Sequence, residues 1–392
     1  MLNDRRVTVL GAGVAGLTVA RALALKGAEV TVLEQAPEIR EVGAGLQISP
    51  NGARVLSALG LGAALDGIGI PAERVDLIDG EGGGRVVSLD LRYGGQGGHF
   101  RFVHRADLIS ILAEAARAAG AEIRLLQQVS DVTLGQGAPQ LHMANGAEVE
   151  ADILIGADGL HSKVRQALNG QVAPFFTGQV AWRATIPADP GIAPVARVFM
   201  GAGRHLVTYP LRGGSLRNIV AVEERRKWVE ESWNLTDDPL ALRIAFENFV
   251  PELRGWLDRI ERPNLWGLFR HPVAETWHGH GAAILGDAAH PTLPFLAQGA
   301  NMALEDAWVL AACLAERAPD EAFATYQAQR RPRCARIVDA ATRNARNYHL
   351  SGMTREVAHM GLRLANRLAP KSMLRRFDWL YRHDVTGGQG RG

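Results

Sequence analysis

Short apolar runs alternate with a helical pattern in the first part of the chain. Residues 7–10, "VTVL", form an apolar run that ends at Gly11. Residues 14–27 are rich in Ala and Leu and end in glycine, which is typical of a helix with its C-terminal cap. The segment "EVTVLEQ" at 29–35 is the next apolar run. This strand–helix–strand order predicts a parallel, doubly wound sheet.

The pattern changes in the middle of the chain. Between residues 175 and 225, four apolar or alternating segments are separated by Gly and Pro, with no helical pattern between them. They read "QVAWRATI", "ARVFM", "HLVTYPL" and "RNIVAVEE". Strands joined in this way predict an antiparallel sheet, typical of a separate substrate layer. Other predicted elements are helices at 50–60, 106–120, 239–257 and most of 300–383, and buried strands at 151–159 and 283–286.

Composition narrows the class of protein. The chain has 392 residues, enough for two domains, of which 47% are hydrophobic and 21% charged. A formal net charge of +2 gives no strong attraction to nucleic acid or acidic membranes. No run approaches the about 18 apolar residues of a membrane span. Cys313 and Cys334 stand alone, which excludes a disulfide framework and a zinc knuckle. We therefore expect a cytoplasmic protein.

Residues 11–16, "GAGVAG", follow a strand and open a helix. The first glycine permits a tight turn, the second lets the backbone approach a pyrophosphate, and the third permits close packing of the helix on the strand. The helix N-terminus adds amide donors and a partial positive charge. Glu34 ends the second strand, where its carboxylate can bind a ribose. The predicted dinucleotide contacts are Gly11, Gly13, Ala15, Gly16, Glu34 and Gln35.

A second loop, far along the chain, favours FAD over NAD. Residues 283–307, "AILGDAAHPTLPFLAQGANMALEDA", run from an apolar strand through a loop of small residues into a helix. A simple NAD enzyme has no need of this loop, whereas the long FAD molecule requires contacts along its ribityl chain and ring. We expect Asp287 to bind a ribityl hydroxyl and the backbone of Gly299, Ala300 and Asn301 to face the polar edge of the flavin. The alternative is that Asp287 only caps a turn.

Three segments together resemble the fingerprints of the class A flavoprotein monooxygenases, the FAD-dependent aromatic hydroxylases similar to para-hydroxybenzoate hydroxylase. They are "GAGVAGLTVARAL", "GADGLHSKVR" and "GDAAHPTLPFLAQGANMALEDA", in order and at suitable separations. The segments "EVGAGLQISPNGARVLSALG" and "YPLRGG" further resemble the branch of salicylate hydroxylase and 3-hydroxybenzoate 6-hydroxylase.

The resemblance implies a reaction in two stages. NADH or NADPH reduces FAD, and reduced FAD adds O2 to form a flavin C4a-hydroperoxide, which an electron-rich phenolate attacks. The implied substrate is a phenolic aromatic compound, such as the hydroxybenzoates salicylate or 3-hydroxybenzoate. Two alternatives stay open: an FAD-dependent dehydrogenase or oxidase that inserts no oxygen, and a nicotinamide-only Rossmann enzyme.

The resemblance also assigns cofactor roles to single residues. Arg105, in "VHRADL", matches an arginine that reaches the ribityl or phosphate region of the flavin. Its alternative is a solvated charge on the first turn of a helix. Asp158 with Gly159 matches a motif linked to both FAD and the nicotinamide cofactor. Gln47, also placed among the cofactor contacts, stands where some relatives carry His, so contacts with the ring differ there.

Two side chains of the antiparallel sheet carry the predicted chemistry. His205 and Tyr209 are four residues apart and share a face if strand alternation holds. In the hydroxylases of this branch, a His and a Tyr at matching places line the ring pocket, beside a glutamine that matches Gln298. The resemblance thus implies that neutral His205 takes the phenolic proton and that Tyr209 orients the ring oxygen. Alternatively, both are plain cross-strand residues. Arg183 and Arg212 are candidates for binding a substrate carboxylate.

Two other polar clusters are assigned no chemistry. His278 and His280, in "WHGHGA", lack a convincing third ligand, so no metal site is predicted. Asp158, His161 and Ser162 crowd one turn, where a hydrolase triad rarely forms.

These patterns predict an α/β fold. A Rossmann-like FAD-binding domain with a parallel sheet is interrupted by a substrate domain with an antiparallel sheet and followed by C-terminal helices. Residues 357–382 mix apolar side chains with Arg at helical spacing, so they form a homodimer surface or pack on their own FAD-binding domain. The expected boundaries are 1–72, 100–174 and 276–325 for the FAD-binding domain, 73–99 and 175–275 for the substrate domain, 326–386 for the helical region and 387–392 for a disordered tail.

Overall fold

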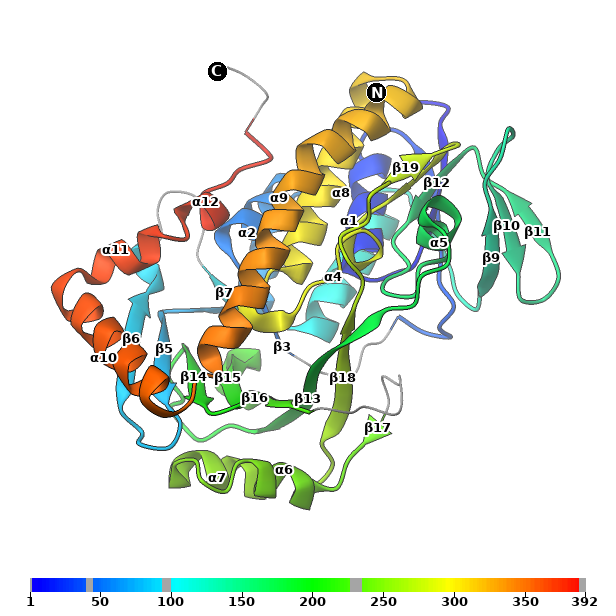
Figure 1. The fold of residues 1–392 in the computed structure, drawn as a ribbon. Helices are drawn as coiled ribbons and strands as arrows, with labels where there is room; N and C mark the ends of the chain where they lie inside the picture. Colours follow the sequence, from blue (N-terminus) through cyan, green and yellow to red (C-terminus); the bar gives the residue numbers. More distant parts are fainter. Residues whose placement is uncertain (1, 40–44, 94–99, 226–234, 388–392) are drawn as a thin grey trace.

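Two large sheets organise the chain, one in the upper and one in the lower half of Figure 1. The computed structural model describes residues 2–39, 45–93, 100–225 and 235–387. Residues 388–392 of the predicted disordered tail lie outside the described residues, while the N–H of Gly387 donates a hydrogen bond to Asp384 at 3.3 Å. Among the described residues, no helix combines the length and the apolar character needed to cross a membrane.

Six strands form the first sheet. In spatial order they are β19 (His278–Gly279), β20 (Ala282–Ile284), β12 (Ile153–Gly156), β1 (Arg6–Leu10), β2 (Glu29–Leu33) and β8 (Glu122–Arg124). All neighbours run parallel except β19, which closes one edge in the antiparallel direction. Every residue of β12 and β20 is buried, as expected for the continuous apolar runs of a parallel sheet. The predicted fold class is confirmed.

Helices cover the first sheet and carry its core. Helix α1 (Val14–Ala24) packs against α4 (Arg105–Ala118) and α8 (Gly299–Glu316). A small antiparallel sheet packs along α5 (Lys163–Asn169) and was not predicted from the sequence. Its strands are short and few of their residues are buried, so their apolar pattern is weak. They are β9 (Val129–Thr133), β10 (Gln140–Met143) and β11 (Glu148–Glu150).

Eight strands form the second sheet. In spatial order they are β17 (Leu235–Thr236), β18 (Asn264–Arg270), β13 (Phe175–Pro187), β16 (Leu216–Glu224), β15 (Arg204–Leu211), β14 (Val195–Gly201), β5 (Arg74–Asp79) and β6 (Arg85–Asp90). The four strands predicted between residues 175 and 225 are all present and antiparallel. The pair β14–β5, which joins these strands to an earlier segment of the chain, is parallel. Because β5 is far from β14 in the sequence, no hairpin turn fixes the direction in which the two strands pair.

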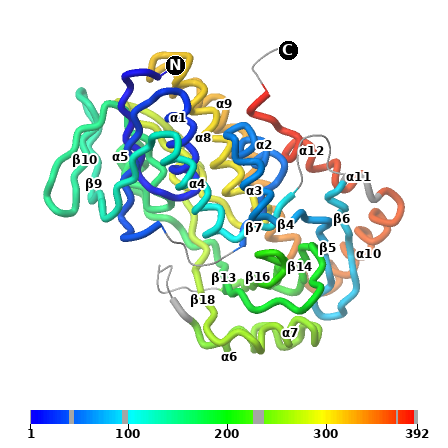
Figure 2. Tube along the Cα trace, turned by 180° about the vertical axis from the view of Figure 1, so that it is seen from behind, coloured from blue at the N-terminus to red at the C-terminus, as the bar shows by residue number. Residues whose placement is uncertain are grey.

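The two faces of the second sheet have different neighbours. Helices α6 (Pro239–Ala245) and α7 (Pro251–Asp258) cover its outer face (Figure 2). There Leu206 of β15 packs in a cluster with Trp182 and Phe246. Because side chains alternate along a strand, His205 and Tyr209 share the opposite face, which points toward the part of the molecule that holds the first sheet. The predicted alternation from 205 to 209 is confirmed.

Further elements connect the two halves. Helix α9 (Pro319–Tyr348) packs on α8, and its last residue lies in apolar clusters with strands of the second sheet (Figure 1). A three-stranded sheet with β7 at its centre lies at the junction and was also not predicted. Its strands are β3 (Gly45–Ile48), β7 (Arg101–His104) and β4 (Ile70–Pro71). The remaining helices are α2 (Pro50–Ala58), α3 (Gly62–Ile68), α10 (Gly352–Leu368), α11 (Pro370–Arg375), α12 (Asp378–Tyr381) and the 3-10 turns η1 (Leu91–Tyr93), η2 (Arg212–Gly214), η3 (Gly286–Ala288) and η4 (Pro294–Leu296).

Candidate active site

In the glycine loop between β1 and α1, Gly11 and Gly16 are tightly packed, whereas Gly13 has free space beside it. Gly11 has φ +95°, and a Cβ on it would lie 2.5 Å from the carbonyl oxygen of Ala157. A Cβ on Gly16 would lie 1.9 Å from the carbonyl oxygen of Gly11. Around Gly13, no atom lies within 4 Å of such a Cβ. The loop therefore leaves its middle glycine open at the N-terminus of α1, where a phosphate can approach the backbone.

Glu34 lies at the end of β2, beside the glycine loop. Its Oε2 accepts a hydrogen bond from the N–H of Ala12 at 2.7 Å, and its Oε1 accepts one from Ala36 at 2.9 Å. These bonds fix the carboxylate at the loop, and each oxygen keeps a second lone pair for a ribose hydroxyl. Gln35 is exposed just beyond it.

Asp158 follows β12 and faces the same end of the sheet. Its Oδ2 accepts a hydrogen bond from the N–H of Lys163 at 2.7 Å. Its Oδ1 is buried and has no partner within the described residues. Burial raises the pKa of this carboxyl group. Gly159 has φ +75° and open space around its Cα, while Ser162 caps α5 by accepting from Arg165 at 2.9 Å. Ser162 therefore has a structural role, in line with the rejected hydrolase triad.

The Gly286-Asp287 turn lies against α1. Gly286 contacts Ala15, which brings the two sequence motifs together. Asp287 is exposed, whereas Gly286 and Ala288 on either side are buried. Enough protein surrounds the carboxylate that desolvation raises its pKa, while the charges of His290 and Arg105 act in the opposite direction. Arg105, the first residue of α4, thus lies close enough to Asp287 to interact with it electrostatically.

A buried ion-pair network holds this turn in place. Asp306 accepts a hydrogen bond from the N–H of Gly286 at 3.1 Å, contacts His290 and pairs with Arg330 at 2.7 Å. Although burial opposes ionisation, His290 and Arg330 lower the pKa of Asp306 to about 2. His290, Asp306 and Cys334 have ligand atoms within 4.8 Å of one another, as a metal site requires. The guanidinium of Arg330 already neutralises Asp306, so we interpret the cluster as a structural ion-pair network.

Helix α8 begins at the predicted cofactor loop. Ala297 adopts the left-handed conformation with φ +52°, and the first helical hydrogen bond runs from Met302 to Gln298. The N–H groups of Gly299, Ala300 and Asn301 precede that bond, so they have no partner within the helix. The side chain of Asn301 binds other backbone groups: it donates to the carbonyl of Gln47 at 3.0 Å and to that of Ala297 at 2.8 Å, and accepts from Ser49 at 3.0 Å.

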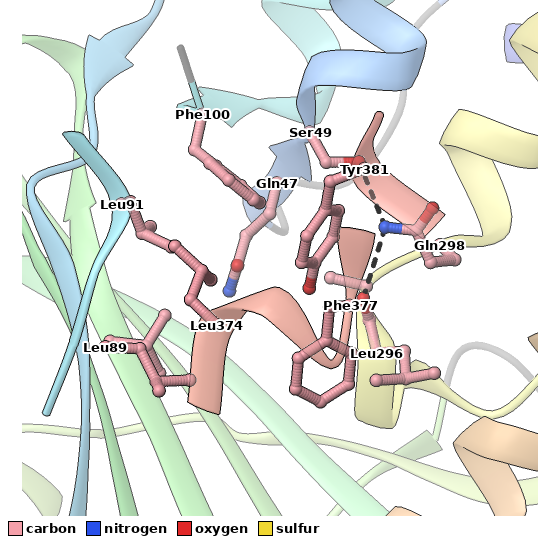
Figure 3. Close-up of a pocket in the computed structure, with 12 residues that line it drawn as sticks. Gln47, Ser49, Leu89, Leu91, Phe100, Leu296, Gln298, Leu374, Phe377 and Tyr381 are labelled. Carbon is pink, nitrogen blue, oxygen red and sulfur yellow. Dashed lines mark hydrogen bonds between the residues drawn. The ribbon is translucent and has the colours of Figure 1, made fainter. Parts of the chain in front are cut away.

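A pocket opens beside this loop (Figure 3). The amide of Gln298 donates to the hydroxyl of Ser49 at 3.0 Å and accepts from Asn51 at 3.2 Å, so its orientation is fixed. Figure 3 shows the amide of Gln47 pointing into the pocket, with Leu374 on one side and Tyr381 on the other in this view. The other side chains are mostly apolar. The residues that line the pocket are Gln47, Ser49, Val75, Leu89, Leu91, Phe100, Leu296, Ala297, Gln298, Leu374, Phe377 and Tyr381.

His205 and Tyr209 lie on the sheet face below, and neither lines this pocket. The Nδ1 atom of His205 is 2.7 Å from Nε2 of His349, and its ring contacts Phe295 and Tyr348. Burial, together with His349, lowers the pKa of His205 well below its ordinary value. Tyr209 stacks on Phe102 with ring centroids 4.9 Å apart, and burial raises the pKa of its hydroxyl. Gln47 and Gln298 thus line the same pocket. His205, the predicted base, is buried outside this pocket.

Three further residues lie near His205 and Tyr209. Two of them, Asn218 and His349, were not predicted from the sequence, and Arg183 was one of two candidates for binding a carboxylate. Asn218, across from Tyr209, accepts a hydrogen bond from the N–H of Gly45 at 2.8 Å, and its Nδ2 is buried without a partner within the described chain. His349 lies 144 residues from its contact with His205. Arg183 pairs in register with Val220 and stacks on Trp266 at 4.2 Å. No local pattern marks the first two, because each role depends on a long-range contact.

Comparison with known proteins decides the family. A family model described as "FAD binding domain" matches residues 4–341. A 3-amino-4-hydroxybenzoate 2-monooxygenase from Streptomyces cremeus is 37% identical over 358 residues, which cover 89% of each chain. A 3-hydroxybenzoate 6-hydroxylase from Klebsiella oxytoca is 35% identical over 394 residues, 97% of each. The chain belongs to the FAD-dependent aromatic hydroxylases. A salicylate hydroxylase structure shares the fold of this hydroxylase, with a TM-score of 0.81 at 24% identity, covering 97% of this chain and 96% of that one.

The site of the hydroxylase suits FAD in its chemistry. Gly13 leaves room at the N-terminus of α1, which favours a pyrophosphate. The unpartnered Oδ1 of Asp158 and the exposed carboxylate of Asp287 are acceptors for hydroxyl groups. The N-terminus of α8 supplies amide donors for the polar edge of a flavin. The enzyme uses FAD, with NAD(P)H as the electron donor, to hydroxylate phenolic aromatic compounds.

Proposed function

We propose that the hydroxylase acts on a hydroxybenzoate such as 3-hydroxybenzoate or salicylate. The observation that carries this proposal is one face of the second sheet. Arg183 is aligned through Val220 with Val207, midway between His205 and Tyr209 on the same face. A cation, a neutral imidazole and a phenol on one sheet face suit a ring that bears both a carboxylate and a hydroxyl group. Two relatives are named for substrates of this kind.

Arg183 is the better candidate for the substrate carboxylate. Arg212 forms an ion pair with Asp107 at 2.7 Å, with nearly half of its side chain exposed to water. Arg183 instead lies on the inner face of the sheet, close enough to Tyr209 to counteract the rise in that residue's pKa. A guanidinium is suited to a carboxylate because it donates two parallel hydrogen bonds. We therefore assign Arg212 to the surface.

The protein's own groups have three tasks in the reaction. Bound FAD, once reduced by NAD(P)H, supplies the activated oxygen for the ring. His205, neutral at neutral pH, takes the proton of the substrate hydroxyl through its Nε2, which makes the ring more nucleophilic. Tyr209 donates a hydrogen bond to the ring oxygen. The apolar residues around Tyr209, among them Phe102 and Leu211, exclude water from the ring.

A panel of phenols with isotopically labelled O2 tests this function. We expect hydroxybenzoates to be converted with the label in the product, at a stoichiometry near one NAD(P)H per product. Related phenols without a carboxylate should bind more weakly, because they offer the guanidinium of Arg183 no carboxylate to bind. Consumption of NAD(P)H without labelled product for every hydroxybenzoate would overturn the proposed substrate class and favour oxidase chemistry. Arg183→Met should raise KM for hydroxybenzoates and leave it unchanged for neutral phenols.

We also propose a homodimer formed through α10. The described part of this helix exposes an apolar stripe at intervals of three to four residues, and each member is between 57% and 84% exposed. Such a stripe rarely stays in water on a stable surface helix. A second copy of the chain fits because a twofold axis lets the same stripe cover itself. The α10 stripe consists of Met353, Val357, Met360, Leu364 and Leu368.

We place the enzyme in the cytoplasm. Cys313 and Cys334 are buried and free, as expected where thiols stay reduced. The supply of NAD(P)H points to the same compartment. Cell fractionation, with the protein found in the membrane or secreted fraction, would contradict this assignment.

A further inference from the structure

Three titratable side chains form a chain from the interior to water. Nδ1 of His205 lies 2.7 Å from Nε2 of His349, and Nδ1 of His349 lies 2.7 Å from Oε1 of Glu224. His205 is 1% exposed, whereas the side chain of Glu224 is 53% exposed. The residues come from β15, from the end of α9 and from the end of β16. They connect the sheet face that carries the proposed base with the surface.

The hydrogen bonds fix which nitrogen of each ring carries a proton. An ionised carboxylate only accepts, so Glu224 takes a hydrogen bond from Nδ1–H of His349. In a neutral His349 the other nitrogen, Nε2, must then accept from Nδ1–H of His205. The lone pair of His205 therefore lies on Nε2, the nitrogen away from the chain of hydrogen bonds. This is the tautomer that a proton acceptor requires.

The surroundings make a lasting positive charge on His205 costly. The rings packed against it belong to Phe295, Tyr348 and His349, none of which carries a carboxylate. Burial lowers the pKa of His349 as well, while Glu224 raises it and Arg204 lowers it. A base in such a place holds an added proton weakly, because an unpaired buried charge is unfavourable. The proton must leave His205 soon after it arrives.

We propose that His349 and Glu224 are a proton relay, which carries the phenolic proton from His205 to water. This inference rests on the proposed function of His205 as the base. The substrate hydroxyl gives its proton to Nε2 of His205 and becomes a phenolate. The Nδ1 proton of His205 moves to Nε2 of His349, and the Nδ1 proton of His349 moves to Glu224, which releases it to water. A proton that returns along the same path to the product restores both tautomers.

A purely structural role is the alternative. The same bonds tie the end of α9 to the sheet, and the carbonyl of His349 also accepts from the N–H of Gly203 at 3.3 Å. Glu224→Gln separates the two roles, because a glutamine oxygen still accepts from Nδ1–H of His349 but does not carry a proton onward. His349→Gln likewise keeps one donor and one acceptor without a titrating group. Glu223→Gln is the matched control, because Glu223 lies on the same strand as Glu224 but pairs with Arg204 and Arg225.

The experiment follows proton release when 3-hydroxybenzoate binds to the oxidised, FAD-loaded enzyme. A pH indicator in weak buffer reports the released proton in a stopped-flow instrument, and thermal melting and flavin content verify each variant. We expect Glu224→Gln and His349→Gln to slow release and hydroxylation about tenfold or more, since a lost acid–base group costs roughly 10²–10⁴-fold when no solvent replaces it. Melting temperature, flavin content and the rate of FAD reduction should stay unchanged, and Glu223→Gln should behave as the wild type.

Two outcomes would overturn separate parts of the account. If His205→Ala impairs hydroxylation while both relay variants release protons at the wild-type rate, the relay is wrong and the base stands. If His205→Ala itself releases the proton and hydroxylates at the wild-type rate, the proposed base is wrong and the relay has no function.

Discussion

Gly286 packs against Ala15, so the turn that carries Asp287 contacts the helix that follows the glycine loop. A Cβ on Gly286 would lie 3.0 Å from the Cβ of Ala15, and Gly286 has φ +61°, in the left-handed region. Both features favour glycine there. The turn that presents Asp287 is thereby seated on the helix that begins at the pyrophosphate loop.

Gly286→Ala should therefore destabilise the enzyme and weaken FAD binding together. A non-glycine residue in the left-handed region costs about 1–2 kcal/mol, and the contact with α1 adds to that cost. Thermal melting with and without FAD, and flavin content after purification, measure the effect. Gly137→Ala is the control, because no atom lies within 4 Å of a Cβ there. Equal melting temperatures for the two variants would contradict this reading of the turn.

Asp287→Ala should weaken FAD binding with little loss of stability. The carboxylate is exposed and near Arg105, so its removal leaves no buried charge uncompensated. A charge-assisted hydrogen bond to a ribityl hydroxyl is worth roughly 1.5–3 kcal/mol, which corresponds to a Kd about 10- to 150-fold higher. Fluorescence titration of the apoprotein with FAD gives the value. An unchanged Kd would remove Asp287 from the cofactor site.

Stability should fall as the pH drops below the ordinary pKa of histidine. Burial lowers the pKa of seven histidines, whereas only His290 among the shifted ones is raised. Below pH 6.5 the unfolded chain binds protons that the folded chain does not, so the free energy of unfolding decreases. We expect a lower melting temperature at pH 5.5 than at pH 7.5, and a smaller difference in His205→Gln. A higher melting temperature at pH 5.5 would show that His290 outweighs the others.

Charge on the α10 stripe should separate the proposed dimer. Leu364→Asp places a carboxylate at the centre of a self-complementary apolar contact, where both copies would bury it. Light scattering at micromolar concentration should give a dimer for the wild type and a monomer for the variant, with activity retained. Leu126→Asp is the control, because Leu126 is 70% exposed outside the stripe. A monomeric wild type would contradict the dimer.

Local patterns in the sequence predict the parts of the site that depend on local geometry. The glycine loop, the turn at Asp287 and the shared face of His205 and Tyr209 follow from turn chemistry and from the period of a strand. The parallel direction of β5 does not follow, because no short turn links it to β14. Its pairing is decided by the path of the whole chain.

The contact between His205 and His349 likewise cannot be predicted from local sequence patterns. It depends on the length and direction of α9, whose 30 residues carry His349 from the first half of the molecule to the second sheet. The histidine itself stands in "RNYHL" without a recognisable motif. Leu374, Phe377 and Tyr381, which form part of the pocket wall, could not be predicted for the same reason. The C-terminal helices that carry them reach the pocket only through the folding of the whole chain.

His205→Ala under single-turnover conditions tests whether His205 is the base that removes the phenolic proton. Holoenzyme loaded with 3-hydroxybenzoate is reduced with NAD(P)H and then mixed with isotopically labelled O2. We expect normal flavin content and reduction, and hydroxylation slower by about 10²–10⁴-fold, partly restored at higher pH because solvent then helps to remove the proton. Labelled product formed at the wild-type rate at neutral pH would contradict the claim, since the base would then lie elsewhere.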